Sequence, residues 1–206
     1  MLDEMTPPPI GVPREPQRLY PKLLGATWSA LDPVVQRVHT DTSLTHAEGV
    51  FQVSRAPGRL MELILDVAGV PRSSGGAQVR LVVTHRGLVE RWHRSFSGRP
   101  LVTIQSEAPG GLLAERIGLF EFLSSLTIKD GELVFRHVRL AIRLGQFRIP
   151  LPDWLSFKVA GREGPASATD GAGDQTSVDV RVTGPTDALL FAYRGTVRWR
   201  SGEDPA

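Results

Sequence analysis

The sequence predicts a mainly β protein, in which an antiparallel meander of about nine strands curls into a barrel or half-barrel. Three observations favour this fold. From Thr45 onward apolar and polar residues alternate with period two, compact turns such as Asp130-Gly131 separate the alternating segments, and most connections are short. Because long twisted sheets rarely stay flat, we expect closure, with a β-sandwich as the alternative that has the same periodicity.

The expected strands follow each other along most of the chain. They cover residues 45–53, 79–83, 89–96, 101–105, 112–117, 120–129, 133–144, about 157–162, 178–182 and 189–199. Residues 1–16 are Pro-rich and predict a flexible arm, residues 164–175 predict a mobile Gly/Ala/Ser/Asp loop, and residues 201–206 form a tail. We therefore expect a single β-rich domain over residues 17–200.

Three helices are expected beside the strands. Pro21 and Gly25 bracket a short helix, and Asp32-Pro33 combines an N-cap with a first-turn proline to begin a second one. A third helix, at about 59–68, is apolar around most of its circumference and ends before Gly69. Such a helix needs cover, so we expect it to lie over the sheet.

The composition excludes several classes of protein. The 206 residues are 41% hydrophobic and 22% charged, which is typical of a globular domain. The sequence contains no cysteine, signal peptide or apolar run long enough to span a membrane, so we expect a cytoplasmic protein without a membrane span. The arginines alternate with other residues and form no basic block, and this pattern does not predict nucleic-acid binding.

Several short motifs are distributed over roughly residues 19–199. They are Leu19-Tyr20-Pro21, Leu23-Leu24-Gly25, Ala47-Glu48-Gly49 with Phe51 and Val53, Trp92-Arg94-Phe96, 115–118, Ile149-Pro150-Leu151-Pro152 and Tyr193-Arg194-Gly195. Together these motifs resemble a bacterial family, the domain of unknown function DUF4166. The resemblance implies one domain without a known activity. Members resemble stand-alone proteins or C-terminal partners of NAD-binding, dehydrogenase-like domains, which implies an oxidoreductase as an alternative partner.

The sequence does not predict a cofactor. Gly171-Ala172-Gly173 begins like a dinucleotide-binding loop, but Thr176 replaces the third glycine and a strand follows where a helix is required. His46 and Glu48 share a strand face, and His93 or His137 could join them as metal ligands if the strands paired suitably. A solvated strand face is the favoured interpretation of this spacing.

Charged and aromatic residues supply the candidate ligand-binding site. Six charged residues of the strands predict either a buried cluster or, as we favour, ion pairs on the outer face. They are Glu48, Glu90, Glu115, Arg94, Arg136 and Arg139. Arg136 is in register with Val138 and Leu140, and a polar side chain on that apolar face needs a partner or a ligand. Four aromatic residues are expected either to pack in the core or to form the wall of a pocket: Trp92, Trp154, Tyr193 and Trp199. The candidate residues are Glu48, Trp92, Arg94, Glu115, Arg136 and Tyr193.

These observations favour a non-catalytic module that binds a small apolar or amphipathic molecule. No catalytic residue is predicted, because the chain has no cysteine and no Gly-x-Ser-x-Gly nucleophile motif. The first alternative is an enzyme, or an accessory domain of an NAD-dependent dehydrogenase-like partner, that uses Glu48, Arg94 and Glu115. The second alternative is a protein-interaction domain that docks through a strand edge or an apolar patch.

Overall fold

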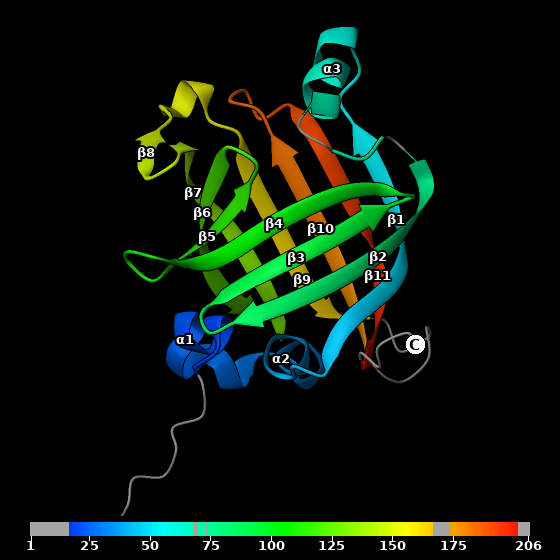
Figure 1. The fold of residues 1–206 in the computed structure, drawn as a ribbon, viewed down its shortest axis with the longest axis vertical. Helices are drawn as coiled ribbons and strands as arrows, with labels where there is room; N and C mark the ends of the chain where they lie inside the picture. The colour runs from blue at the N-terminus through cyan, green and yellow to red at the C-terminus, as the bar shows by residue number, and fades with distance from the viewer. Residues whose placement is uncertain (1–16, 68–69, 73, 167–173, 202–206) are drawn as a thin grey trace, which may run out of the picture.

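The computed structural model describes residues 17–67, 70–72, 74–166 and 174–201 (Figure 1). The expected arm at 1–16 and the tail from residue 202 lie outside the described residues, as does the Gly171-Ala172-Gly173 segment. The expected loop at 164–175 lies outside them at 167–173. Its described parts include the end of one strand and the start of the next.

Eleven antiparallel strands are described, and ten of them close into a barrel. Each barrel strand pairs with its two neighbours in the order β1-β2-β3-β4-β5-β6-β7-β9-β10-β11, and β11 pairs back with β1. The eleventh strand, β8, pairs only with β7 and lies outside the ring. Closure confirms the predicted barrel and excludes the sandwich. The strands are β1 (Leu44–Arg55), β2 (Ser74–Arg86), β3 (Val89–Phe96), β4 (Arg99–Ala108), β5 (Leu112–Ile117), β6 (Phe120–Lys129), β7 (Glu132–Leu144), β8 (Phe147–Pro150), β9 (Lys158–Pro165), β10 (Gln175–Thr183) and β11 (Leu189–Ser201).

Tight turns set the register of the meander. Asp130 and Gly131 both have positive φ, at 54° and 79°, which is the backbone of a two-residue turn that matches the twist of paired strands. Lys129 therefore faces Glu132 across the turn, and β6 runs back along β7. This is the strongest turn signal of the sequence, and the structure confirms it.

Two glycines lie where strands β1 and β11 pair. Gly49 of β1 pairs with Val197, and Gly195 of β11 pairs with Phe51. A Cβ atom at Gly49 would lie 1.9 Å from the carbonyl oxygen of Thr196, and one at Gly195 would lie 2.2 Å from the carbonyl oxygen of Val50. Only glycine fits at these two positions, where the first and last strands join.

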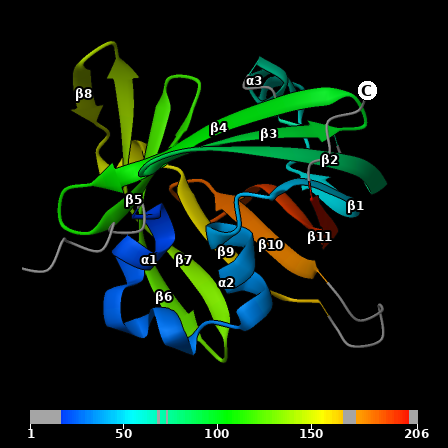
Figure 2. The same cartoon turned by 60° about the horizontal axis from the view of Figure 1, so that its bottom comes forward.

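Two helices and a 3₁₀ helix cover one end of the barrel (Figures 1 and 2). They are α1 (Leu19–Leu24), η1 (Gly25–Ala30) and α2 (Pro33–Thr40), and Asp32 caps α2 by accepting a 2.9 Å hydrogen bond from the Val34 amide. Tyr20 and Val35 are fully buried beneath this cover. The predicted N-terminal helices are thus present and close the barrel end.

Helix α3 (Arg59–Val67) stands at the opposite end of the barrel (Figure 1). Leu65 is buried against the core, but Leu63 is 62% exposed. The sequence led us to expect a largely covered helix over the sheet, and the exposure of Leu63 limits that cover. None of the described helices, α3 included, has the length and hydrophobicity required to cross a membrane.

Candidate functional site

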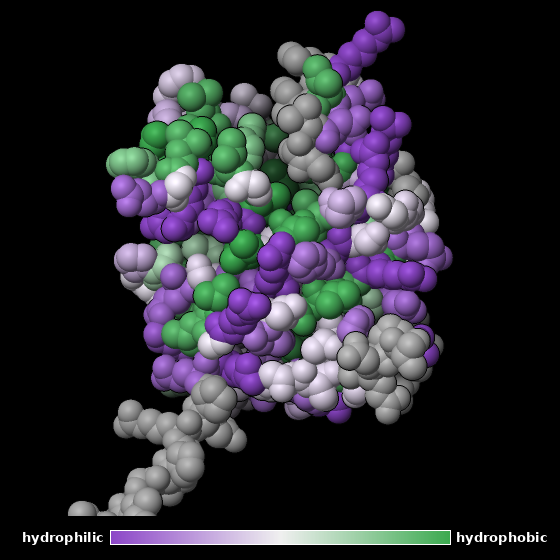
Figure 3. Space-filling model, viewed as in Figure 1, coloured by the Kyte–Doolittle hydropathy of each residue, from purple (hydrophilic) through white to green (hydrophobic). Residues whose placement is uncertain are grey.

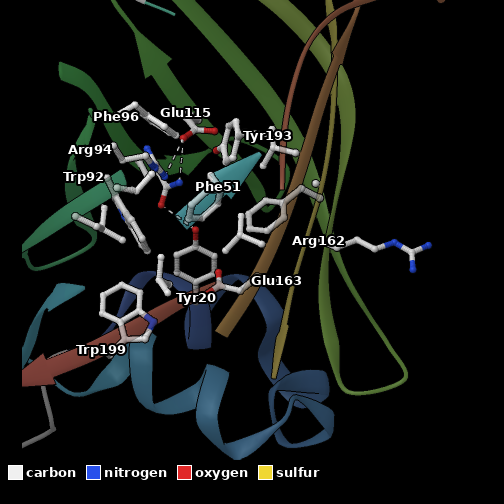
Figure 4. Close-up of a pocket in the computed structure, with 18 residues that line it drawn as sticks. Tyr20, Phe51, Trp92, Arg94, Phe96, Glu115, Arg162, Glu163, Tyr193 and Trp199 are labelled. Carbon is white, nitrogen blue, oxygen red and sulfur yellow. Dashed lines mark hydrogen bonds and ion pairs between the residues drawn. The ribbon is translucent and has the colours of Figure 1, made fainter. Parts of the chain in front are cut away.

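The barrel interior contains a cavity with a volume of about 80 Å³, near the end that α1 and α2 cover (Figure 4). Aromatic side chains from five different elements form much of its wall. Trp92 and Trp199 meet edge to face with their ring centroids 6.0 Å apart, and the ring centroids of Tyr193 and Phe51 are 5.6 Å apart. The cavity is therefore bounded by rigid apolar surface.

Four of the six predicted site residues line this cavity: Trp92, Arg94, Glu115 and Tyr193. Trp92 and Arg94 share a face of β3 because they are two residues apart, while β5 supplies Glu115 and β11 supplies Tyr193. The barrel therefore brings together residues that lie far apart in the sequence.

Glu48 and Arg136 lie outside the cavity. Glu48 is half exposed on the outer face of β1, between Arg80 at 3.6 Å and Arg200 at 3.7 Å. The outer-face interpretation of the charged residues therefore holds for Glu48, whereas Glu90, Arg94 and Glu115 are buried or half-buried.

The predicted register of Arg136 with Leu140 is wrong, because a β-bulge interrupts β7. Leu123 of β6 pairs with Arg139, but the next residue, Ser124, pairs with His137, so Val138 is an additional residue. The bulge reverses which side chains face inward. Arg136 is exposed, and Val138 is 48% exposed, while Leu140 is fully buried. Arg136 therefore does not interrupt the inner face.

One polar group of the cavity is built around Arg94. Its Nη1 donates a 2.8 Å hydrogen bond to Thr103, its Nη2 lies 4.0 Å from Glu115 Oε1, and its guanidinium lies 5.1 Å from the ring centroid of Trp92. Gln105 donates to Glu115 and accepts a 2.8 Å hydrogen bond from the Tyr20 hydroxyl. Arg94 is thus surrounded by partners of its own chain.

A second polar group joins Glu90 to His39, His85 and Glu163, which the sequence did not single out. His39 of α2 is fully buried, with its Nε2 3.3 Å from Glu163 Oε2 and its Nδ1 4.0 Å from Glu90 Oε2. Glu90 accepts a 3.0 Å hydrogen bond from the Trp92 indole, and His85 lies 3.5 Å from its other oxygen. A signal for His39 was present, since it follows Val35 by four residues on the buried helix face.

Glu163 lines the cavity from β9, next to Tyr20 (Figure 4). Its side chain is 8% exposed, and its Oε1 has no hydrogen-bond partner among the described residues. The expected strand ended at residue 162, one position short. Continued alternation through Gly161 would have indicated that Glu163 faces inward.

The buried charges change the proton affinity of their neighbours. Burial by itself would lower the pKa of His39, but the carboxylates of Glu163 and Glu90 outweigh it and raise this pKa above its ordinary value. Burial is also the main reason why the pKa of Tyr193 is raised to about 12 and that of Tyr20 lies well above its usual range. Both phenols therefore stay protonated when the pH passes 10, and the Tyr20 hydroxyl donates to Gln105.

The metal interpretation gains no support from the described part of the chain. There, no group of three His, Asp or Glu side chains is arranged to hold a metal ion. His46 and His93 are exposed, and His137 lies on another strand, 3.4 Å from the Ser156 hydroxyl.

Comparisons with known proteins give a family and two distant structural similarities. The profile of the family described as "Domain of unknown function (DUF4166)" matches residues 31–197. The crystal structure of Rv2717c from M. tuberculosis is 11% identical, with 82% of this chain and 99% of that chain covered and a TM-score of 0.44. A candidate thioesterase II from Thermobifida fusca YX is 14% identical, with coverages of 81% and 82% and a TM-score of 0.25. No curated protein matches the sequence, and neither structure is similar enough to assign a function.

Proposed function

This chain belongs to the DUF4166 family, whose description gives no activity. From the structure of the barrel, we propose that the protein is a non-catalytic module that binds a small apolar or amphipathic molecule. The observation that carries this proposal is the cavity with aromatic walls and polar groups. Ligand sites in proteins commonly combine apolar walls with a few placed polar groups, and the mouth or interior of a barrel is a frequent location.

The volume of the cavity limits the size of the ligand. About 80 Å³ corresponds to two or three water molecules at about 30 Å³ each, well below the roughly 300–1,000 Å³ typical of sites for larger ligands. Because each non-hydrogen atom contributes at most about 1.5 kcal/mol, a ligand of this size binds weakly unless the barrel widens around it.

Native mass spectrometry of gently purified protein tests this function. We expect an additional mass that disappears on denaturation and that a Trp92→Leu variant retains less well. Trp154→Leu is the matched control, because Trp154 is 72% exposed and lies away from the cavity. Absence of any bound mass, together with no binding of small organic probes added at millimolar concentration, would overturn the proposal.

An enzyme, or an accessory domain of an NAD-dependent dehydrogenase-like partner, is a second candidate. The observation in its favour is the convergence of Arg94 and Glu115 at the cavity. Glu48, the third charged residue expected to take part, lies on the outer face. Co-elution with a dehydrogenase-like protein on size-exclusion chromatography, lost in a Glu115→Gln variant but kept in Glu48→Gln, would favour this candidate over a binding module.

A protein-interaction domain is a third candidate, and an exposed apolar patch around β8 favours it. Figure 3 shows apolar surface at the end of the molecule where Figure 1 places β8. We define this β8 patch by its exposed side chains: Leu119, Leu144, Phe147, Ile149, Trp154 and Leu155.

The occupant that we propose for the β8 patch is a second copy of the chain. Among the described strands β8 alone lies outside the closed ring and leaves an edge unpaired, and an antiparallel strand edge is complementary to itself across a two-fold axis. Light scattering should therefore show a dimer that the double variant Phe147→Ser/Ile149→Ser disrupts and the exposed control Val50→Ser leaves intact. A monomeric wild-type protein would overturn this candidate.

A further inference from the structure

We propose that the ligand of the barrel is a small aliphatic amine, bound as its ammonium ion through a hydrogen bond to Glu163. This inference rests on the binding function proposed above and specifies the chemical class of the ligand. It is carried by three independent features of the cavity, namely an unpaired carboxylate oxygen, the distribution of charge around it and the aromatic rings beside it.

The unpaired oxygen is the first feature. The side chain of Glu163 is 92% removed from solvent, since only 8% of it is exposed, and the described chain satisfies only its Oε2 atom through His39. Buried carboxylate oxygens normally accept hydrogen bonds, because an unmade bond to a buried charge is costly. Oε1 belongs to a residue of the cavity wall, so a donor from a ligand can supply the missing bond.

The charge balance is the second feature. Two buried carboxylates, Glu163 and Glu90, flank the single imidazole of His39, at 3.3 Å and 4.0 Å. His85 lies 3.5 Å from Glu90. Of the other charged residues that line the cavity, Arg94 lies 4.0 Å from Glu115, and Arg162 is largely exposed and lies 3.6 Å from Glu132. The two carboxylates Glu163 and Glu90 therefore outnumber the one charge of a protonated His39, and this favours a cationic donor over a neutral one.

The aromatic wall is the third feature. Tyr20, Trp92 and Trp199 line the same cavity, together with Phe51 and Tyr193. Ring faces attract ammonium ions within about 6 Å, and the attraction is strongest where water is excluded. Such a wall accommodates both the charge of an ammonium ion and the short apolar chain attached to it.

A carboxylate ligand at Arg94 is the obvious competitor. Arg94 already donates to Thr103, lies over Trp92 and has Glu115 at 4.0 Å, so its charge is matched within the protein. An acid bound there would also bring a second carboxylate close to Glu115. The free oxygen of Glu163 has no such compensation, and we therefore place the polar end of the ligand at Glu163.

Protein-observed NMR titration with three probes that each contain three carbon atoms tests the assignment. Propylammonium chloride, 1-propanol and sodium propionate are added to the wild-type protein at matched ionic strength. We expect saturable shifts from propylammonium at residues of the cavity wall, at millimolar concentration, with 1-propanol at least about tenfold weaker and propionate weaker still. A preference for propionate or propanol would overturn the amine assignment while supporting the binding function.

A charge-removing variant and a control complete the experiment. Glu163→Gln keeps the shape of the side chain and should weaken propylammonium at least about tenfold, whereas Glu48→Gln on the outer face should not. Equal binding by Glu163→Gln and wild type would overturn the assignment. If none of the three probes binds and native mass spectrometry finds no bound mass, the proposed function fails together with the assignment. The ranking of probes on the wild-type protein does not depend on the folding of a variant.

Discussion

The imidazole Nε2 of His39 lies 3.3 Å from Oε2 of Glu163, although the two residues are 124 positions apart in the chain. Helix α2 brings His39 to the covered end of the barrel, and β9 brings Glu163 to the same place. The contact therefore joins the N-terminal helical cover to the barrel interior, and it does so with two titratable groups that are both buried.

This pair makes the stability of the protein dependent on pH. The pKa of His39 is raised in the folded protein, mainly by Glu163 against the opposing effect of burial, so its stabilising contribution is complete below the ordinary value of 6.5. The contribution is lost as the pH rises through the higher folded pKa. We expect the free energy of unfolding, measured with urea, to decrease across that interval.

Two variants separate His39 from other titrating groups. His39→Gln should lack the decrease, while His46→Gln, which changes an exposed histidine, should keep it. NMR titration of the His39 ring measures its pKa directly, and we expect a value above 6.5. A His39 pKa below 6.5 would contradict the prediction, since burial would then outweigh the carboxylates.

The two tyrosines of the chain predict a second pH effect. Burial raises the pKa of Tyr193 to about 12 and that of Tyr20 well above 10, so the folded protein should show no tyrosinate absorbance as the pH passes 10. In denaturant both residues should titrate near 10. Because raised pKa values favour the neutral form, the folded state should lose stability above pH 10, and tyrosinate should form together with unfolding. Early titration of either tyrosine would indicate an accessible hydroxyl.

The strands and the closed barrel were largely predictable because their signals are local. Alternation predicts which residues can form a strand, and Asp130-Gly131 predicts the reversal between β6 and β7. The number and twist of such strands favour closure, but a β-sandwich has the same periodicity, so the pairing of β11 with β1 had to come from the structure. The expectation for α3 was less accurate, because its apolar surface does not reveal that the helix sits at the barrel end with Leu63 exposed.

The interior was predictable only in part. Trp92 and Arg94 lie on a face that alternation identifies, but the bulge that turns Arg136 outward depends on the pairing of Leu123 and Ser124 with β7. The meeting of His39 with Glu163 depends on how the helices fold across the barrel end. Neither relationship has a signal within the few residues around it.

Ion pairs of Asp66 hold α3 to the barrel. Its carboxylate lies 2.9 Å from Arg55 and 3.0 Å from both Arg72 and Arg99, and hydrogen bonds from these three guanidinium groups lower its pKa. Asp66→Asn should therefore speed hydrogen exchange in α3 while leaving the barrel strands unchanged. Glu62→Gln, on the same helix, is the control. Because the pKa is lowered, this anchor should persist on acidification below 3.8 and be lost only as the pH falls through the lower folded value.

Substitutions at Gly49 and Gly195 should destabilise the protein where β1 pairs with β11. An added Cβ would meet backbone atoms, the Thr196 oxygen at 1.9 Å and the Val50 oxygen at 2.2 Å, and neither can move without separating the strands. We expect Gly49→Ala or Gly195→Ala to lower the free energy of unfolding by about 3 kcal/mol or more, at the upper end of overpacking costs. Gly75→Ala is the control, because nothing lies within 4 Å of its added Cβ. Urea unfolding measures all three variants, and equal stability of Gly49→Ala and Gly75→Ala would show that the two strands separate without cost.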